Sequence, residues 1–295
     1  FGMYSCAGTL TCAGYPSSFD HEYLDAQTFA DFGIDFLKYD FCYKPETSDG
    51  PLLYYRMGMA LKATGREILF SACNWGSDNV WQWIRSTGAH MYRSTGDIVD
   101  RPNSFRDIAF SQIPMLSQSA PGCYNDTDML ICGMYNKGNV GFGGCNQEQY
   151  DMHFALWCMM ASPLMIGCDI RNTTPQMIDL LNNKELIRIN QDAECRPPMI
   201  ISGKNPDGTN SAKLILFRLL EDGEYALGVF NFTDGDARPI RVELFDIGLS
   251  LGCGKALELV DVMSGERFEN VTETFSPPMN YHACRVFRCR IVDAK

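Results

Sequence analysis

The sequence predicts an α/β protein, a (β/α)8 barrel followed by an antiparallel β-sandwich. Up to Asn190, short β-favouring runs alternate with helical patterns, which is typical of βαβ units in a parallel sheet. Polar residues stand at the carboxyl ends of several of these strands, which is where the active site of a barrel lies. After Cys195 the pattern changes to short alternating runs separated by turn residues, which indicates a sandwich.

Six strands are predicted in the barrel part, at residues 1–6, 35–40, 67–73, 90–93, 128–132 and 163–168. Helices are expected between them, at residues 25–32, 53–64, 80–86, 105–112 and 147–160, and a last helix begins at Pro175 with Thr174 as its cap. Six strands are two short of a closed barrel, and we expect a missing beginning of the chain to supply the others. A doubly wound sheet would instead carry a glycine-rich phosphate turn after its first strand, and the sequence shows none there.

The predicted domains are residues 1–194, an N-terminally incomplete catalytic barrel, and residues 195–295, the sandwich. Pro197, Pro198 and the loop 203–208 connect the two. The sandwich strands are expected at residues 213–217, 225–230, 240–244, 256–260 and 284–291.

Composition excludes several functions. The net charge of −11 argues against nucleic acid as a partner, because phosphate binding needs a basic face. We expect no membrane span, since the chain has no long apolar run. Its Cys and His residues lack zinc-site spacing, so neither a metal nor a cofactor is expected. The thirteen cysteines, an odd number with several in apolar runs, favour a reducing cytoplasm, with secretion as the alternative.

Two carboxylates at the ends of different strands, Asp40 and Asp97, indicate a glycosidase. Glycoside cleavage needs one group to attack the anomeric carbon and another to protonate the leaving oxygen. Lys38, two residues before Asp40 on the same strand face, would keep Asp40 ionised as a nucleophile requires. Arg93, four residues before Asp97, opposes an acid role if the two pair directly. Spacing alone leaves that point open.

Five motifs in order resemble glycoside hydrolase family 27, the retaining α-galactosidases and α-N-acetylgalactosaminidases. They are Lys38-Tyr39-Asp40 followed by Cys42, Arg93-x-x-x-Asp97, Asn125-Asp-Thr-Asp-Met-Leu130, Ala155-Leu-Trp157 with Ser162-Pro-Leu164, and Ile189-Asn-Gln-Asp192. The resemblance covers the chain from Tyr4 to about Asp192, and the β-sandwich fits the family's C-terminal domain.

The resemblance implies a role for each matching residue. Asp40 resembles the nucleophile and Asp97 the acid/base of a double displacement, and Cys12 with Cys42 resembles the family's disulfide near the site. Contacts to sugar hydroxyls are implied for Tyr4, Lys38, Arg93 and Asp128. The family's tryptophan and paired aspartates that grip the galactose 4- and 6-hydroxyls come from the first two strands, which we expect to be missing here.

One departure from the family concerns substrate specificity. In the family that the chain resembles, many α-galactosidases have Cys-Glu-Trp at the end of the strand that corresponds to residues 67–73, whereas this chain has Cys73-Asn74-Trp75. An amide both donates and accepts, whereas a carboxylate mainly accepts. We assign Asn74 to the sugar's 2-substituent or, as the alternative, to the turn before Gly76. Trp75 is assigned to a sugar platform, with a core aromatic as the alternative. A terminal α-D-galactoside is the first expectation, and a 2-acetamido sugar or a β-L-arabinopyranoside remains open.

Two rival functions belong to other classes. Lys38 could be the Schiff-base lysine of a barrel aldolase, but a neighbouring Asp40 would keep it charged. A non-catalytic sugar-binding protein is the second rival, and the intact Asp40 and Asp97 argue against it. Asp126 is assigned to turn structure rather than to binding. The expected partner is a galactose-containing oligosaccharide or glycoside, and the sequence leaves open whether the protein forms a homo-oligomer.

Overall fold

The computed structural model describes residues 1–138, 140, 143–235 and 239–295. The chain divides into two compact units, one made of Phe1–Asp97 with Gln118–Asp128 and the other of Ile98–Ser117 with Met129–Lys295. The expected domain boundary at residues 194 and 195 lies inside the second unit, where helices give way to antiparallel strands. The division into a barrel domain and a sandwich domain stays a prediction.

A parallel sheet forms the centre of the first unit. Its strands lie in the order β1-β2-β3-β4-β5, with bounds Gly2–Cys6, Phe36–Asp40, Leu69–Cys73, Met91–Arg93 and Tyr124–Asp126. The register places Cys6 opposite Asp40 and Asp40 opposite Cys73. The carboxyl ends of these strands therefore lie together at one edge, as a barrel requires.

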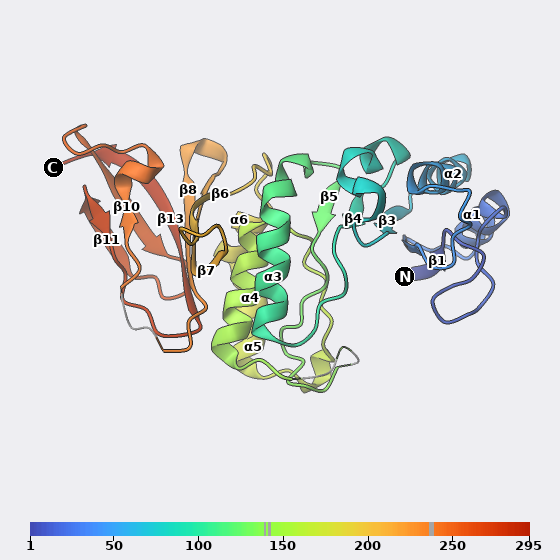
Figure 1. Ribbon diagram of the computed structural model, residues 1–295, viewed down its shortest axis with the longest axis horizontal. Coiled ribbons are helices and arrows are strands. Elements are labelled where there is room, and N and C mark those ends of the chain that lie inside the picture. The colour runs from blue at the N-terminus through green and yellow to red at the C-terminus, as the bar shows by residue number, and fades with distance from the viewer. Residues whose placement is uncertain (139, 141–142, 236–238) are drawn as a thin grey trace. The chain divides into compact units, whose positions relative to one another are not determined.

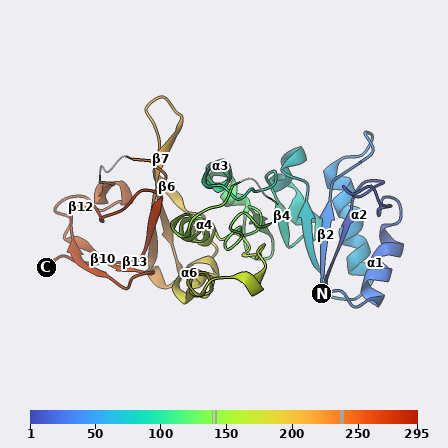
Figure 2. The same cartoon turned by 90° about the horizontal axis from the view of Figure 1, so that it is seen from below.

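Two helices, α1 (Glu22–Asp31) and α2 (Gly50–Ala63), pack against each other beside this sheet (Figure 2). The core between helices and sheet contains Leu37, Tyr39 and Phe70 from the strands. Side chains alternate along a strand, so Leu37 and Tyr39 point to the helices and Lys38 and Asp40 point the other way. The alternation delivers the two charged residues to the face away from this core.

Three expected elements of the first part of the chain differ from the structure. The fifth strand is Tyr124–Asp126 and not residues 128–132, and residues 163–168 contribute one parallel bridge, Ile166 to Leu130, rather than a strand. The expected helix 80–86 is two 3-10 helices, Ser77–Gln82 and Ile84–Thr87. Asp78 and Asn79 have positive φ, which no α-helix accommodates.

Helices α3 (Pro102–Gln112), α4 (Gln147–Met159), α5 (Pro175–Leu181) and α6 (Lys184–Asn190) belong to the second unit, where α3 and α4 run side by side (Figure 1). Helix α4 is buried along nearly its whole length and packs on α3, α6 and the strands β8 and β13. Asn146 caps α4 by accepting from Gln149 N, and Thr174 caps α5 as expected. Sequence reasoning missed the separate helix α6. No helix among the described residues is both long and apolar enough to cross a membrane.

An antiparallel sheet of six strands follows, in the order β11-β10-β13-β8-β7-β6. The bounds are β6 Met199–Lys204, β7 Asn210–Leu219, β8 Tyr225–Asn231, β10 Lys255–Asp261, β11 Arg267–Val271 and β13 Ala283–Asp293. Strands β9 (Val242–Glu243) and β12 (Thr274–Phe275) form a separate pair. One face of the large sheet packs on α4, and a second core, with Phe217, Leu227 and Phe287, covers the other. The sheets confirm the sandwich predicted from the alternating runs, although β6, β11 and β12 were missed and β9 is shorter than expected.

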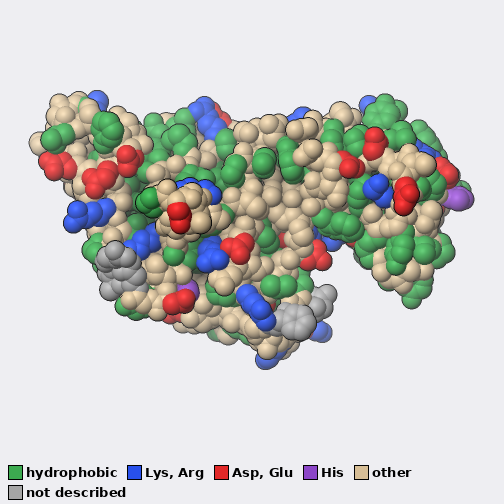
Figure 3. All heavy atoms as spheres, viewed as in Figure 1, with side chains coloured by type: hydrophobic (Ala, Val, Ile, Leu, Met, Phe, Trp, Pro, Cys, Tyr) green, Lys and Arg blue, Asp and Glu red, His purple; other side chains and the backbone are tan. Residues whose placement is uncertain are grey.

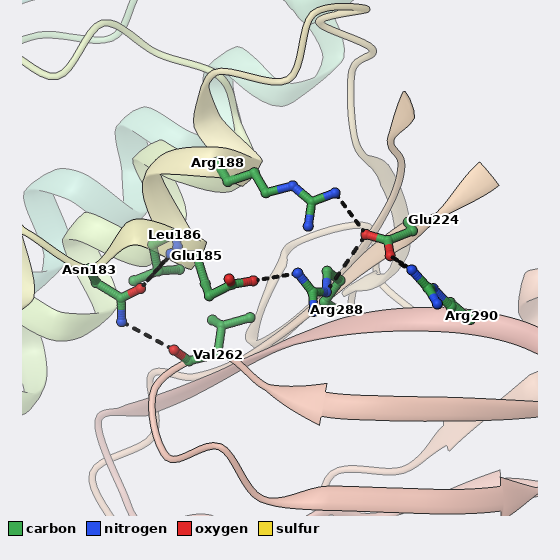
Figure 4. Close-up of polar contacts among 8 residues, drawn as sticks. All are labelled: Asn183, Glu185, Leu186, Arg188, Glu224, Val262, Arg288 and Arg290. Carbon is green, nitrogen blue, oxygen red and sulfur yellow. Dashed lines mark hydrogen bonds and ion pairs between the residues drawn. The ribbon is translucent and has the colours of Figure 1, made fainter. Parts of the chain in front are cut away.

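A buried carboxylate links helix α6 to this sheet (Figure 4). Glu224 ion-pairs with Arg188 of α6 at 3.2 Å and with Arg288 at 3.6 Å, and Arg290 Nε donates to it at 2.8 Å. Arg288 also pairs with Glu185 of α6 at 2.7 Å. On the face drawn in Figure 3, acidic and basic side chains are interspersed rather than gathered by sign.

Candidate active site

Asp40, the expected nucleophile, is the last residue of β2 and is buried, with 6% of its surface exposed. Its Oδ1 accepts from the Phe41 backbone N–H at 2.9 Å and its Oδ2 from the Tyr4 hydroxyl at 2.8 Å. Burial and the bond to Asp40 both raise the pKa of Tyr4, so this hydroxyl stays a donor. Two donors thus hold the carboxylate in one orientation.

Lys38 lies on the same strand face as Asp40 and is half-buried. Among the described residues it makes no ion pair or hydrogen bond, so its ammonium is available to a ligand. The thiol of Cys73, opposite Asp40 on β3, feels both charges, but burial dominates and raises its pKa to about 12. Cys73 is therefore a neutral neighbour of the two charged groups and not a nucleophile.

Arg93 ends β4 and joins two carboxylates. Its guanidinium is buried and lies 3.0 Å from Asp97 Oδ1 and 2.9 Å from Asp128 Oδ2. The Asp97 side chain is 78% exposed, whereas that of Asp128 is 9% exposed. The direct Arg93–Asp97 pair that the spacing left open is present, and Arg93 has a second, buried partner in Asp128.

Asp126 and Asp128 follow β4 on the neighbouring strand. Asp126 ends β5, is buried, and accepts from the Asp128 N–H at 3.0 Å, the turn bond expected of it. Burial, opposed by Arg93, raises the pKa of Asp126 to about 6. Asp128 has a φ of +84°, a conformation rare for a residue with a side chain. The residues lie at and after a strand end, not at the strand start where sequence reasoning placed them.

Asn74 and Trp75 leave β3 in a strained turn. The Asn74 side chain is fully buried, and its Nδ2 donates to Ser77 O at 2.9 Å. Its Oδ1 has no hydrogen-bond partner among the described residues. Trp75 has a φ of +58° and is 39% exposed. Gly76 follows with a φ of +88°, and a Cβ there would lie 2.5 Å from Ser94 O. The amide nitrogen thus supports the turn, and the amide oxygen is left for another group.

Cys12 and Cys42 form a disulfide with a Cα–Cα distance of 5.4 Å. It joins the loop after β1 to the loop after β2, next to Asp40. Backbone contacts hold the same loops together: Ala7 N donates to Asp40 O at 2.8 Å, and a Cβ at Gly8 would lie 2.0 Å from Cys42 O. Only glycine allows this approach.

The structure brings the expected site residues together in the first unit. Tyr4 lies on β1, Lys38 lies within β2, and Cys12 follows β1, whereas the other site residues lie at or after the carboxyl ends of β2 to β5. Sequence reasoning missed the Tyr4–Asp40 bond, which depends on the strand register, and the burial of Asp126. One signal was available in the sequence. Every second residue of a strand points to the same face, so pairing Tyr4 with Lys38 and Cys6 with Asp40 puts all four side chains on one face of the sheet.

The fold and the site define a barrel protein with carboxylates, a lysine and an arginine at the carboxyl edge of its parallel sheet. Residues 1–192 match the family model described as Alpha galactosidase A (Melibiase_2). The chain therefore belongs to glycoside hydrolase family 27.

Named relatives agree with this assignment. The chain is 36% identical to the alpha-galactosidase of Cyamopsis tetragonoloba, covering 97% of this chain and 65% of that protein. It is 37% identical to alpha-galactosidase 3 of Arabidopsis thaliana, covering 97% of this chain and 62% of that protein. The chain thus spans less than two thirds of the length of these curated relatives.

Solved structures share the fold. Alpha-galactosidase I of Mortierella vinacea matches with a TM-score of 0.85 and 30% identity, over 99% of this chain and 76% of that one. A β-L-arabinopyranosidase of Geobacillus stearothermophilus matches with a TM-score of 0.81 and 18% identity, over 98% and 73%, which shows the common fold alone.

Proposed function

We propose that the protein hydrolyses terminal α-D-galactosides with retention of configuration. The observation that carries the proposal is the buried Asp40 carboxylate, oriented by Tyr4 and Phe41 at the carboxyl end of β2 and accompanied by Lys38 on the same face. A carboxylate that is to attack an anomeric carbon must be ionised and fixed in direction. The relatives named alpha-galactosidases support galactose as the sugar.

Asp40 is the proposed nucleophile and forms a glycosyl ester, and Asp97 the proposed acid and then base. Asp97 must carry a proton to release the first product, and in the structure its Oδ1 lies 3.0 Å from the Arg93 guanidinium. Since Arg93 also pairs with the buried Asp128, Asp97 can separate from it without leaving the guanidinium unpaired. We propose that the bound sugar separates Asp97 from Arg93, and that Arg93, Asp128 and Lys38 bind its hydroxyls.

The natural substrate is proposed to be a galactose-containing oligosaccharide or glycoside. Asn74, with its free amide oxygen, and the exposed Trp75 are proposed to contact the sugar. A 2-acetamido sugar or a β-L-arabinopyranoside is the alternative. We place the reaction in the cytoplasm because eleven of the thirteen cysteines are free thiols.

The test is an assay of the full-length protein on nitrophenyl α-galactoside, α-N-acetylgalactosaminide and β-L-arabinopyranoside. Asp40→Asn should abolish turnover, whereas Asp97→Ala should still form the glycosyl-enzyme from good leaving groups and should regain turnover with azide. The control is Asp246→Asn, an exposed aspartate of the second unit, which should keep full activity.

Proton NMR of the first-formed sugar completes the test. Retention of the substrate's anomeric configuration is expected, and inversion would refute the double displacement. Sugar binding without turnover of any of the three substrates would instead support a non-catalytic sugar-binding protein.

A further inference from the structure

Three atoms that bind metal ions lie together beside the proposed nucleophile. Cys12 Sγ, Cys42 Sγ and a carboxylate oxygen of Asp40 lie within 4.8 Å of one another. Two thiolates and a carboxylate are a ligand set that Zn²⁺ and similar thiophilic cations prefer. In the structure the two sulfurs are joined as a disulfide, so the set becomes available only on reduction.

The loops that carry these residues do not depend on the disulfide for their positions. Thr9 N donates to Tyr43 O at 3.2 Å, and the Cys6 thiol donates to Cys42 O at 3.1 Å. The loop of Cys12 closes on itself, since Thr11 N donates to Tyr15 O at 2.8 Å. The two cysteines should therefore stay neighbours after the bond between them is broken.

The backbone spacing suits a bound ion. A tetrahedral Zn²⁺ with Zn–S bonds of about 2.3 Å holds two sulfurs about 3.8 Å apart. With the Cα atoms 5.4 Å apart, a rotation of the side chains reaches this separation once the sulfurs are no longer bonded. Cys12 is exposed and Cys42 half-buried, so an ion has access to the site.

We propose that reduction of the Cys12–Cys42 disulfide creates a site for a thiophilic divalent cation, held by Cys12, Cys42 and Asp40. A dithiol reductant supplies two electrons and two protons and becomes a cyclic disulfide, while the Cys12–Cys42 bond breaks into two thiols. The cation then displaces both thiol protons and takes one carboxylate oxygen of Asp40. Water completes the tetrahedron.

The ion acts as a redox-gated inhibitor in this arrangement, and this consequence rests on the proposed function. Asp40 cannot attack an anomeric carbon while one of its oxygens is bonded to a cation. The oxidised protein has no thiolate at this position and keeps its carboxylate free. Activity then depends on both the redox state of the disulfide and the supply of the cation.

The test uses Co²⁺ as the probe on the full-length protein, because tetrahedral cobalt bound to thiolates absorbs in the visible and near ultraviolet. One sample is reduced with a phosphine that is then removed without air, and the other stays oxidised. Reduced protein should bind one more Co²⁺ per chain than oxidised protein, with thiolate-to-cobalt bands. The eleven free cysteines are the same in both samples, so the difference reports Cys12 and Cys42.

Variants separate the ligands. Cys12→Ser with Cys42→Ser should remove the difference between the samples, and Asp40→Asn should weaken Co²⁺ binding to the reduced protein by at least about 10-fold while keeping the thiolate bands. The matched control is Cys253→Ser, which removes the exposed free thiol and should leave the difference unchanged. Equal Co²⁺ binding by reduced and oxidised wild type would overturn the proposal, as would an unchanged affinity in Asp40→Asn.

Inhibition is measured separately. Zn²⁺ should abolish galactoside hydrolysis by the reduced protein, a chelator should restore it, and the oxidised protein should be unaffected at the same Zn²⁺ concentration. Reduction-dependent Co²⁺ binding by a protein that hydrolyses no glycoside would refute the proposed function and leave the metal site standing. An active enzyme that binds no additional cation on reduction would refute the metal site and leave the proposed function standing.

Discussion

Replacing Tyr4 by phenylalanine tests whether this residue orients the nucleophile or contacts only the sugar. The substitution keeps the ring and removes the hydroxyl that donates to Asp40 Oδ2 at 2.8 Å. Among the residues that the structure describes, the Phe41 N–H then remains as the donor to the carboxylate, on Oδ1. A hydrogen bond to a charged group contributes about 1.5–3 kcal/mol.

If Tyr4 holds Asp40 in its attacking direction, this energy is lost in the transition state. The value of kcat/KM should then fall by roughly 10- to 150-fold, since 1.4 kcal/mol corresponds to a factor of 10. The loss should appear in kcat, because the oriented carboxylate matters when the glycosyl bond forms. It should also be the same on nitrophenyl galactoside and on its 2-, 3-, 4- and 6-deoxy analogues.

The resemblance to family 27 assigns Tyr4 to a sugar hydroxyl, and the same panel tests that role. A sugar contact predicts a loss that disappears on the one deoxy substrate that lacks the hydroxyl in question. A rise in KM alone, with the loss absent on one analogue, would refute the orienting role. Tyr23→Phe, which removes an exposed hydroxyl from α1, is the matched control and should have no effect.

Three other substitutions test stability. Burial raises the pKa of Asp126 from 3.8 to about 6, so the folded state binds its proton more tightly than the unfolded state, and the free energy of unfolding should fall by about 2 kcal/mol as pH rises from 4 to 7. Asp126→Asn should remove that fall in urea titrations, and an identical pH dependence in the variant would contradict it. His153 accepts from Ile131 N at 3.2 Å, and burial lowers its pKa from 6.5 to about 3. The free energy of unfolding of the wild type should therefore fall by about 3 kcal/mol as pH falls from 6.5 to 4, and that of His153→Gln should fall much less. Glu224→Gln should lower the free energy of unfolding by about 1–3 kcal/mol rather than the 3–5 kcal/mol of a fully buried pair, since the side chains of its three arginine partners remain 29–68% exposed. Calorimetry should show no change for Glu221→Gln, the control at an exposed position. A loss in Glu224→Gln no larger than that of the control would show that the ion-pair network does not stabilise the fold.

The sequence was sufficient for most of the barrel strands because their apolar residues alternate and their ends are polar. Strands β1 to β4 lie where the alternation placed them. The run Met129-Leu-Ile131 has the same composition as a strand, yet Leu130 makes only one bridge and Ile131 N donates to a histidine of α4. A hydrogen bond between a backbone N–H and a side chain far away in the chain cannot be recognised from the local sequence. The fifth strand was therefore expected at residues 128–132 instead of Tyr124–Asp126.

The candidate site was predictable residue by residue but not in its connections. Charges at strand ends identified Asp40 and Arg93 without any structure. The Tyr4 bond and the sharing of Arg93 between Asp97 and Asp128 depend on how β1 and β2, and β4 and β5, are paired. The burial of Asp126 depends on tertiary packing, so its short turn motif alone suggested only a local role.

The close approach at Gly8 limits which sequences this site can tolerate. A methyl group at position 8 would meet Cys42 O at 2.0 Å, far inside the C···O contact distance of about 3.3 Å, so the two loops would have to separate by more than an ångström. The Ala7 N–H is bonded to the carbonyl of Asp40, and a separation of the loops therefore shifts the backbone of the nucleophile itself. Substitutions are easier to accommodate at the exposed Tyr15, whereas position 8 admits no side chain, and a library built on this scaffold should leave position 8 unchanged.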